Sequence, residues 1–261
     1  MVDRIKDRVA IVTGASRGIG EAIARQMVAK GGQVVLTARN KSRLDAIVDE
    51  LGDAALAVQC DVADREQVKA MVAATIEHFG RVDILVNNAG IGLSGVIADF
   101  DLDDLERVFA VNVFGVVACI QAVIPHMRAQ NWGHIVNISS ILGKRAVPQT
   151  AGYAASKFAL HALSDGLRVE EAPNNIEVTV ICPGSTETDF RENELKSGTI
   201  LLAERPRVNL KSSDDVAAIT LKAIQRRSRE IVVSPFGKLF SVLEKTMPSA
   251  VDMALKRTYH K

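Results

Sequence analysis

The feature that most constrains the fold is a short apolar segment that runs directly into a glycine-rich loop. Residues 9–13 are typical of a buried strand, and Gly14-Ala15-Ser16-Arg17-Gly18-Ile19-Gly20 follows at once, before a helical pattern over residues 21–30. Glycines let the backbone approach a pyrophosphate, and a helix N-terminus offers unpaired N–H groups. This order predicts a phosphate-binding turn. Its spacing, G-x-x-x-G-x-G, differs from the commoner G-x-G-x-x-G fingerprint, so a plain glycine-rich turn stays an alternative.

The rest of the chain alternates strand and helix patterns without a linker or repeat. We predict strands at residues 9–13, 34–38, 54–60, 84–87, 134–138, 177–182 and 230–234. We predict helices at residues 19–30, 41–51, 65–79, 102–127, 153–171 and 213–227. Such βαβ repetition requires right-handed crossovers and a parallel sheet covered on both faces. The expected fold is α/β, a doubly wound and mostly parallel Rossmann sheet in a single domain with a C-terminal helical tail.

Composition excludes several classes of function. The chain has 261 residues, of which 48% are hydrophobic, and its 32 basic and 31 acidic residues leave no overall charge for binding nucleic acid. Three cysteines and five histidines lack metal-ligand spacing, so no metal site is expected. The cysteines lie in apolar surroundings, which indicates free thiols in a reducing compartment. The charged first residues contain no apolar signal segment, so we expect a cytoplasmic protein.

Residues 108–124 form the most hydrophobic stretch. Asn112 and Gln121 interrupt it, and it is shorter than the roughly 20 apolar residues that a membrane span needs. We therefore expect a buried helix and no transmembrane span. Because its outward face is as apolar as its inward face, a partner helix is also expected.

A tyrosine and a lysine stand at positions i and i+4 of the predicted helix 153–171. This spacing places the Tyr153 phenol and the Lys157 ammonium on one face. A free phenol titrates near ~10, and a fixed positive charge lowers that pKa toward the range useful for proton transfer. Ser140, after the apolar run 134–138, is a candidate to bind the oxygen that gains or loses the proton. Ser139 competes for this role, but the spacing to Tyr153 favours Ser140.

With these motifs in their order, the chain resembles the short-chain dehydrogenase/reductase family. The segments that carry the resemblance are residues 13–20, Asn87-Asn88-Ala89-Gly90, Asn112 in V-N-V-F-G, the set of Ser140, Tyr153 and Lys157, and Pro183-Gly184 with Thr188. The match is strong to about residue 190 and looser beyond it. The resemblance implies interconversion of a carbonyl and an alcohol with a nicotinamide cofactor.

The resemblance also implies roles for individual residues. The expected catalytic residues are Asn112, Ser140, Tyr153 and Lys157. The expected cofactor-binding residues are Gly14, Ser16, Arg17, Gly18, Ile19, Gly20, Arg39, Asp61, Val62, Asn88, Ala89, Gly90, Tyr153, Lys157, Pro183, Gly184, Thr186 and Thr188. In the family the segment of Asn88 is largely architectural, the backbone carbonyl at the position of Asn112 helps to hold a water, and Asp61 with Val62 would contact the adenine.

Two of these residues have plainer alternatives. Asn88 suits a turn after the fourth strand, and Asp61 suits the N-terminal cap of the next helix.

The choice of cofactor follows from the end of the second predicted strand. NAD sites of this type usually place an acidic residue there, which binds the ribose hydroxyls and repels a 2′-phosphate. Here the strand ends in Leu36-Thr37-Ala38-Arg39, without a carboxylate. Arg39 can bind a phosphate, and Arg17 adds a second cation. We therefore expect NADP(H).

The substrate is only loosely constrained. Ile91, Leu93, Leu142 and Val147 are candidates for an apolar pocket wall, and residues 185–212, with Ile200, Leu201 and Leu202, would form a lid. These residues favour a hydrophobic ketone, aldehyde or secondary alcohol. Two alternatives are a β-ketoacyl carrier-protein reductase and a non-catalytic NADP(H)-sensing protein. Against the first, the chain lacks the I-T-G-Q and D-G-G ending of that group.

The end of the chain forms a helical extension over residues 236–261, beyond a catalytic domain at residues 1–235. Leu239, Phe240, Leu243 and Met247 recur at helical spacing, and Pro248 breaks the run. We expect this tail to pack on the domain or on a dimer mate and to help enclose an apolar substrate. Weak peripheral membrane contact is the alternative. The expected assembly is a homodimer, with a tetramer as the alternative.

Overall fold

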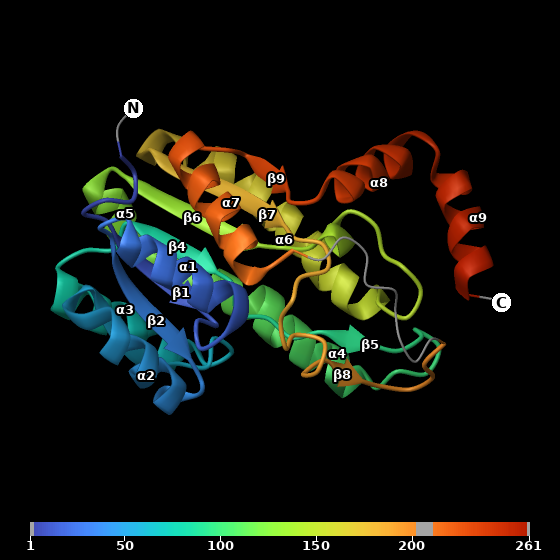
Figure 1. Ribbon diagram of the computed structural model, residues 1–261, viewed down its shortest axis with the longest axis horizontal. Coiled ribbons are helices and arrows are strands. Elements are labelled where there is room, and N and C mark those ends of the chain that lie inside the picture. Colours follow the sequence, from blue (N-terminus) through green and yellow to red (C-terminus); the bar gives the residue numbers. More distant parts are fainter. Residues whose placement is uncertain (1–2, 202–210, 260–261) are drawn as a thin grey trace.

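The computed structural model describes residues 3–201 and 211–259 and contains one doubly wound α/β domain (Figure 1). The main sheet consists of β1 (Val9–Thr13), β2 (Gln33–Ala38), β3 (Ala55–Gln59), β4 (Ile84–Asn87), β6 (Gly133–Ile138), β7 (Ile176–Cys182) and β9 (Glu230–Val232). Its strand order is β3-β2-β1-β4-β6-β7-β9, and every pairing is parallel. The order reverses between β1 and β4, which is where open α/β sheets bind their ligands.

Helices cover both faces of this sheet. They are α1 (Gly18–Ala29), α2 (Lys41–Leu51), α3 (Arg65–Phe79), α4 (Leu102–Phe109), α5 (Val116–Gln130), α6 (Ala151–Glu170) and α7 (Ser213–Arg226). Two more, α8 (Pro235–Thr246) and α9 (Pro248–Tyr259), follow the last strand and extend away from the sheet (Figure 1). The expected α/β fold with a C-terminal helical tail is confirmed.

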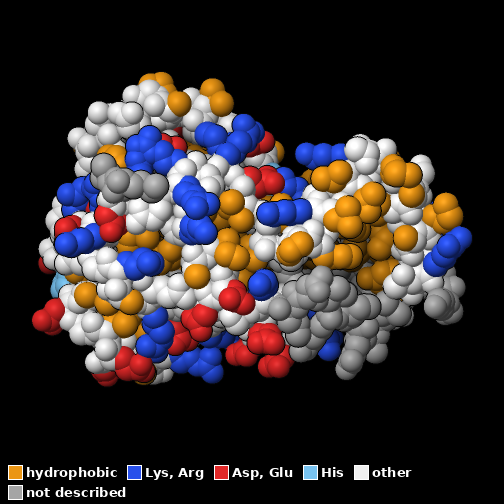
Figure 2. Space-filling view, turned by 45° about the horizontal axis from the view of Figure 1, so that its top comes forward, with side chains coloured by type: hydrophobic (Ala, Val, Ile, Leu, Met, Phe, Trp, Pro, Cys, Tyr) orange, Lys and Arg blue, Asp and Glu red, His pale blue; other side chains and the backbone are white. Residues whose placement is uncertain are grey.

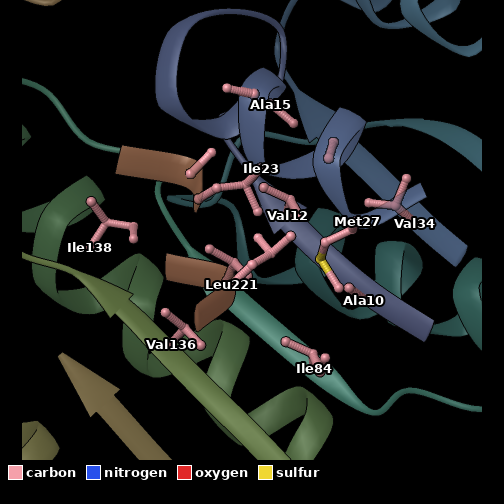
Figure 3. Close-up of a cluster of buried hydrophobic side chains, with 14 of the residues drawn as sticks. Ala10, Val12, Ala15, Ile23, Met27, Val34, Ile84, Val136, Ile138 and Leu221 are labelled. Carbon is pink, nitrogen blue, oxygen red and sulfur yellow. The ribbon is translucent and has the colours of Figure 1, made fainter. Parts of the chain in front are cut away.

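Alternation along the strands divides the core into two layers. In β1, Ala10 and Val12 point to the layer that contains Met27 of α1 and Leu221 of α7 (Figure 3). Ile11 points to the opposite layer, with side chains of α3, α5 and α6. Because successive side chains of a strand alternate between faces, strands buried on both sides need apolar residues throughout, as the sequence has.

The longest helical segment is interrupted. The predicted helix over 102–127 is three elements in one run, α4, a π-helical turn over Ala110–Gly115, and α5, which ends at Gln130. The run from Leu102 to Gln130 is long and apolar enough to cross a membrane by length and composition. However, Cys119, Val123 and Met127 are fully buried in the core layer under the sheet. Core packing therefore accounts for the hydrophobicity of the face that these residues share.

Two other boundaries differ from expectation by two residues each, and one additional sheet is present. Helix α6 begins at Ala151, and β9 ends at Val232 because Ser234 caps α8, its hydroxyl accepting a bond from Gly237 N at 3.0 Å. A second sheet pairs β5 (Leu93–Ser94) with β8 (Leu195–Lys196). Its strands are two residues long, too short to leave a periodic pattern in the sequence.

We expect Ile11→Ala to lower the free energy of unfolding by about 2–5 kcal/mol, because it removes a fully buried side chain from the central strand. Ile97→Ala is the matched control, since Ile97 is 70% exposed, and it should change stability by less than ~0.5 kcal/mol. Urea denaturation of both variants measures the effect. Equal losses of stability would contradict the assignment of Ile11 to the core.

Candidate active site

The glycine loop after β1 is packed tightly against the end of β4. Asn88 Nδ2 donates to Thr13 O at 2.9 Å and to Gly14 O at 3.1 Å, while Thr13 Oγ1 accepts from the backbone N–H groups of Asn88 and Ala89, both at 3.0 Å. A Cβ at Gly20 would lie 2.5 Å from Gly14 O, so no larger residue fits. Asn88 thus holds the loop in shape, in agreement with an architectural role.

Helix α1 begins at Gly18, whose φ of 59° lies in the left-handed region that favours glycine. No side chain caps α1, whereas Asn40 and Asp64 cap α2 and α3. Uncapped N–H groups at a helix start are available to phosphate oxygens. This end of the helix therefore fits the diphosphate of a dinucleotide.

The segment after β7 reaches back to this loop. A Cβ at Gly18 would lie 3.2 Å from the Thr188 methyl group, and Arg17 forms an ion pair with Asp189 at 3.7 Å. Ser16 lies in the same turn, while the Ile19 side chain packs against the core. Thr188 and the glycine loop are thus neighbours.

Two residues predicted to contact the adenosine, Arg39 and Asp61, follow the carboxyl ends of β2 and β3. Arg39 follows β2, is exposed, and makes no ion pair within the described part of the chain. Asp61 does not cap α3, because its carboxylate accepts from Ala63 N at 3.0 Å and Asp64 is the N-cap of that helix. The alternative of Asp61 as a helix cap is therefore wrong. Val62 is buried against Gly115.

Lys157 connects α6 to the end of β6. Its side chain is only 4% exposed, and Nζ donates to Ile138 O at 2.9 Å and lies 5.7 Å from the centre of the Tyr153 ring. Burial lowers the pKa of the Lys157 ammonium to about 8. It stays mostly charged at neutral pH, so a positive charge stands beside Tyr153.

Asn112 lies fully buried in the π-helical turn. Its Oδ1 accepts from Ile91 N at 2.9 Å, and its Nδ2 donates to Ile91 O at 2.9 Å and to Ser156 Oγ at 3.0 Å. The side chain thus satisfies the backbone of the segment that follows Gly90 and ties it to α6. The role expected for its backbone carbonyl stays a prediction.

Ser140 begins a short 3-10 turn, Ile141–Gly143, and its Oγ accepts from Leu142 N at 3.1 Å. Ser139 is buried, 4% exposed, and its hydroxyl has no partner among the described residues. Ile141 N donates to Pro183 O at 2.8 Å, so the ends of β6 and β7 meet here. Beyond them, Gly184 packs near Ser234, and Thr186 donates to Gly184 O at 3.4 Å.

The four candidate pocket-wall residues lie at different depths, and their contact with a substrate stays a prediction. Ile91, Leu142 and Val147 are half-buried, but Leu93 is 2% exposed and packs against Gly152, so it belongs to the core around α6. Of the predicted lid, Ile200 and Leu201 are exposed, and Leu202 lies outside the described residues.

Sequence reasoning missed several residues of the site. Phe190 packs its ring on Tyr153, with centroids 5.6 Å apart. Ser156 joins Asn112 to the backbone of Tyr153, donating to Tyr153 O at 2.7 Å. Ser156 could have been noticed in the sequence because it directly precedes Lys157. Nothing in the sequence distinguishes Phe190.

Comparison with known proteins agrees with this geometry. The family model described as short chain dehydrogenase matches residues 8–198. An uncharacterized oxidoreductase of Staphylococcus saprophyticus is 38% identical over 239 residues, which cover 88% of this chain and 98% of that protein.

Two solved structures have the same architecture. A short chain dehydrogenase/reductase from Burkholderia phymatum in complex with NAD superposes with a TM-score of 0.86 at 29% identity, covering 96% of each chain. A 3-ketoacyl-(acyl-carrier-protein) reductase from Brucella melitensis, complexed with NADH, gives a TM-score of 0.78 at 31% identity and covers 88% of this chain and 95% of that one.

The buried lysine predicts a specific pH dependence of stability. The pKa of Lys157 is about 8 when folded and 10.5 in its ordinary state, so between these values the unfolded chain binds more protons. From pH 8 to 10.5, the stability of the wild type relative to Lys157→Met should therefore rise, by about 2 kcal/mol. Denaturation curves at several pH values measure it. Lys222→Met, at an exposed lysine, is the control, and its stability difference from the wild type should not change with pH. If the stability difference for Lys157→Met is also independent of pH, the burial of Lys157 as a charged group is contradicted.

Proposed function

The chain belongs to the short-chain dehydrogenase/reductase family, and we propose that it is an NADP(H)-dependent oxidoreductase that interconverts a carbonyl and an alcohol. The observation that carries the proposal is the buried Lys157, which lies beside Tyr153 on the same face of α6 and bonds Ile138 O near the turn of Ser140. A sensing protein has no need to keep a costly buried ammonium next to a phenol.

The cofactor site extends along the carboxyl ends of the strands. The uncapped start of α1 would hold the diphosphate, Arg39 and Asp61 would lie at the adenosine end, and Lys157 would bind the nicotinamide ribose. When bound, the cofactor supplies or accepts a hydride. The strand order supports this extent, because β3 and β2 lie on one side of β1, and β6 and β7 on the other.

The chain's own residues would handle the proton. The positive charge of Lys157 would favour the phenolate form of Tyr153. Tyr153 would donate or accept the proton on the substrate oxygen, and Ser140 would orient that oxygen. Phe190 against Tyr153, with the half-buried Ile91 and Leu142, excludes water and favours an apolar substrate. This assignment agrees with the mostly apolar lining that was expected.

NADP(H) is proposed over NAD(H), although the two compared structures were solved with NAD and NADH. No acid stands at the end of β2, and Arg39 is exposed without an ion pair within the described residues. Arg17 is held by Asp189 across 3.7 Å, and both side chains are about half exposed, at 42% and 54%. Such an exposed pair is worth at most ~1 kcal/mol, so a phosphate can displace it.

A second candidate is reduction of a β-ketoacyl thioester, which the similarity to the Brucella melitensis reductase favours. The ending typical of that group is replaced here by β9 and two helices. Turnover of acetoacetyl thioesters above that of simple ketones would favour this candidate.

We also propose a homodimer in the cytoplasm. Phe114 on the π-helical turn and Phe158 on α6 are 61% and 45% exposed, as apolar residues of an interface would be in a single copy.

We expect the wild type to bind NADPH at least about tenfold more tightly than NADH, since two cations are available to a 2′-phosphate. Arg39→Asp should remove or reverse this preference. Arg226→Asp, on the exposed end of α7, changes the same charge elsewhere and should leave the preference intact. Titration by nucleotide fluorescence gives both dissociation constants. Equal affinity, or tighter NADH binding by the wild type, would refute NADP(H) selectivity.

We expect Tyr153→Phe to lower kcat by about 100-fold or more, because the only group lost is the hydroxyl that transfers the proton. The dissociation constant of NADPH should change less than about twofold. A panel of hydrophobic ketones and aldehydes, followed by NADPH oxidation, measures the rate. Retained activity would exclude Tyr153 as the acid or base, and activity confined to small sugars would exclude the apolar substrate.

A further inference from the structure

The position of Ser140 depends on the short turn that carries it. Within this turn, Ser140 Oγ accepts from Leu142 N, and Ile141 N donates to Pro183 O at 2.8 Å. Residues 140–145 have no regular strand or long helix to hold them. Contacts with the surrounding elements must therefore fix the serine hydroxyl.

The inner side of the turn is fixed by α6 and β9. A Cβ at Gly143 would lie 3.0 Å from the His161 ring and 2.8 Å from Ser139 Oγ, so the turn already touches α6 there. Lys144 forms an ion pair with Glu230 of β9 at 2.5 Å. These contacts restrain the turn against α6 and β9.

The outer side is fixed by the C-terminal helices. Arg145 donates through Nη1 to Glu244 of α8 at 2.8 Å and through Nη2 to Asp252 of α9. The side chains of Arg145 and Glu244 are only 23% and 19% exposed, so solvent screens this pair less than a surface pair. A Cβ at Gly237 of α8 would lie 3.2 Å from Ile141, which places α8 directly on the turn.

Hydrophobic burial contributes little to the seating of these helices. In α8 and α9 the buried residues are Gly237 and Val251 alone, one in each helix. Phe236, Leu239 and Met247 are 51%, 57% and 56% exposed. Hydrophobic side chains accordingly gather on the surface of this end of the molecule (Figure 2). The bonds of Arg145 are thus a large share of what sets the direction of α8 and α9.

We propose that Arg145 is a positioning residue, which ties the two C-terminal helices to the turn of Ser140 and thereby holds the serine hydroxyl in its reactive position. The inference rests on the proposed function for Ser140. It goes further because it gives the C-terminal helices a role in catalysis. They would act through the ion pairs of Arg145 with Glu244 and Asp252, and not as an apolar wall around the substrate.

The test compares Arg145→Met with Arg128→Met in the full-length protein. Arg128 forms the same kind of pair with Glu171, whose side chain is 3% exposed, but it lies on α5 away from Ser140. With NADPH and 4-nitrobenzaldehyde as the probe, Arg145→Met should lower kcat about tenfold or more, since small misplacements of a catalytic group are costly. The dissociation constant of NADPH should stay within about twofold, and Arg128→Met should retain the wild-type kcat.

Two further measurements separate positioning from general stability. In a Ser140→Ala background, Arg145→Met should cause less than about a twofold further loss, because both changes act on one group. Combining Arg145→Glu with Glu244→Arg should recover part of the activity that Arg145→Glu loses. Full additivity with Ser140→Ala would overturn the proposal.

Hydrogen exchange tests whether Arg145 holds the turn of Ser140, and it does not depend on enzyme activity. The backbone amides of residues 141–145 should exchange faster in Arg145→Met than in the wild type or in Arg128→Met. If the wild type reduces no carbonyl of the panel, the proposed function fails, and the exchange rates still decide whether Arg145 holds the turn. Unchanged exchange in Arg145→Met would overturn the inference by itself.

Discussion

The site depends on one buried charge. Lys157 reaches from α6 to Ile138 O at the end of β6, and this bond sets where the face of α6 meets the sheet. Burial lowers the pKa of the Lys157 ammonium to about 8. The buried ammonium places a positive charge beside Tyr153. A chain of buried polar groups supports the same junction, because Asn137 links Asn87 of β4 to Ser164 of α6, at 2.9 Å on each side. Helix α6 is therefore fixed to the strand ends by polar bonds, whose directions set its rotation more sharply than apolar packing does.

The sequence was enough to predict the fold, and the edge of the sheet where the candidate site residues gather, because the signals are local. Short continuous apolar runs indicated the seven strands of the main sheet, and parallel strands bring their carboxyl ends to one edge whatever the loops do. Gly14, Asn88, Ser140 and Pro183 each follow such an end, so their gathering needed no knowledge of side-chain contacts. The glycine loop was equally local, since its turn depends on residues that are adjacent in the chain.

What sequence reasoning missed depends on contacts between distant segments. Phe190 meets Tyr153 only after a loop folds back, and β5 finds β8 about a hundred residues along the chain. The helix-cap alternative for Asp61 fails for a different reason, while its predicted adenine contact stays a prediction. Asp61 and Asp64 both precede α3 and both suit a cap, and only the exact start of the helix at Arg65 selects Asp64.

The C-terminal helices combine an apolar outer face with the ion pairs of Arg145. These two kinds of contact differ in how strongly they fix the direction of the helices. Apolar contacts are not directional, so a partner that covered Phe236 and Leu239 would hold α8 without fixing its angle. The planar guanidinium of Arg145 donates to its carboxylate partners only in fixed directions. Arg145 also lies only five residues after Ser140 in the chain. A change in the direction of α8 would therefore reach the serine through Arg145, and the exposed face and the active site are mechanically connected even though they share no side chain.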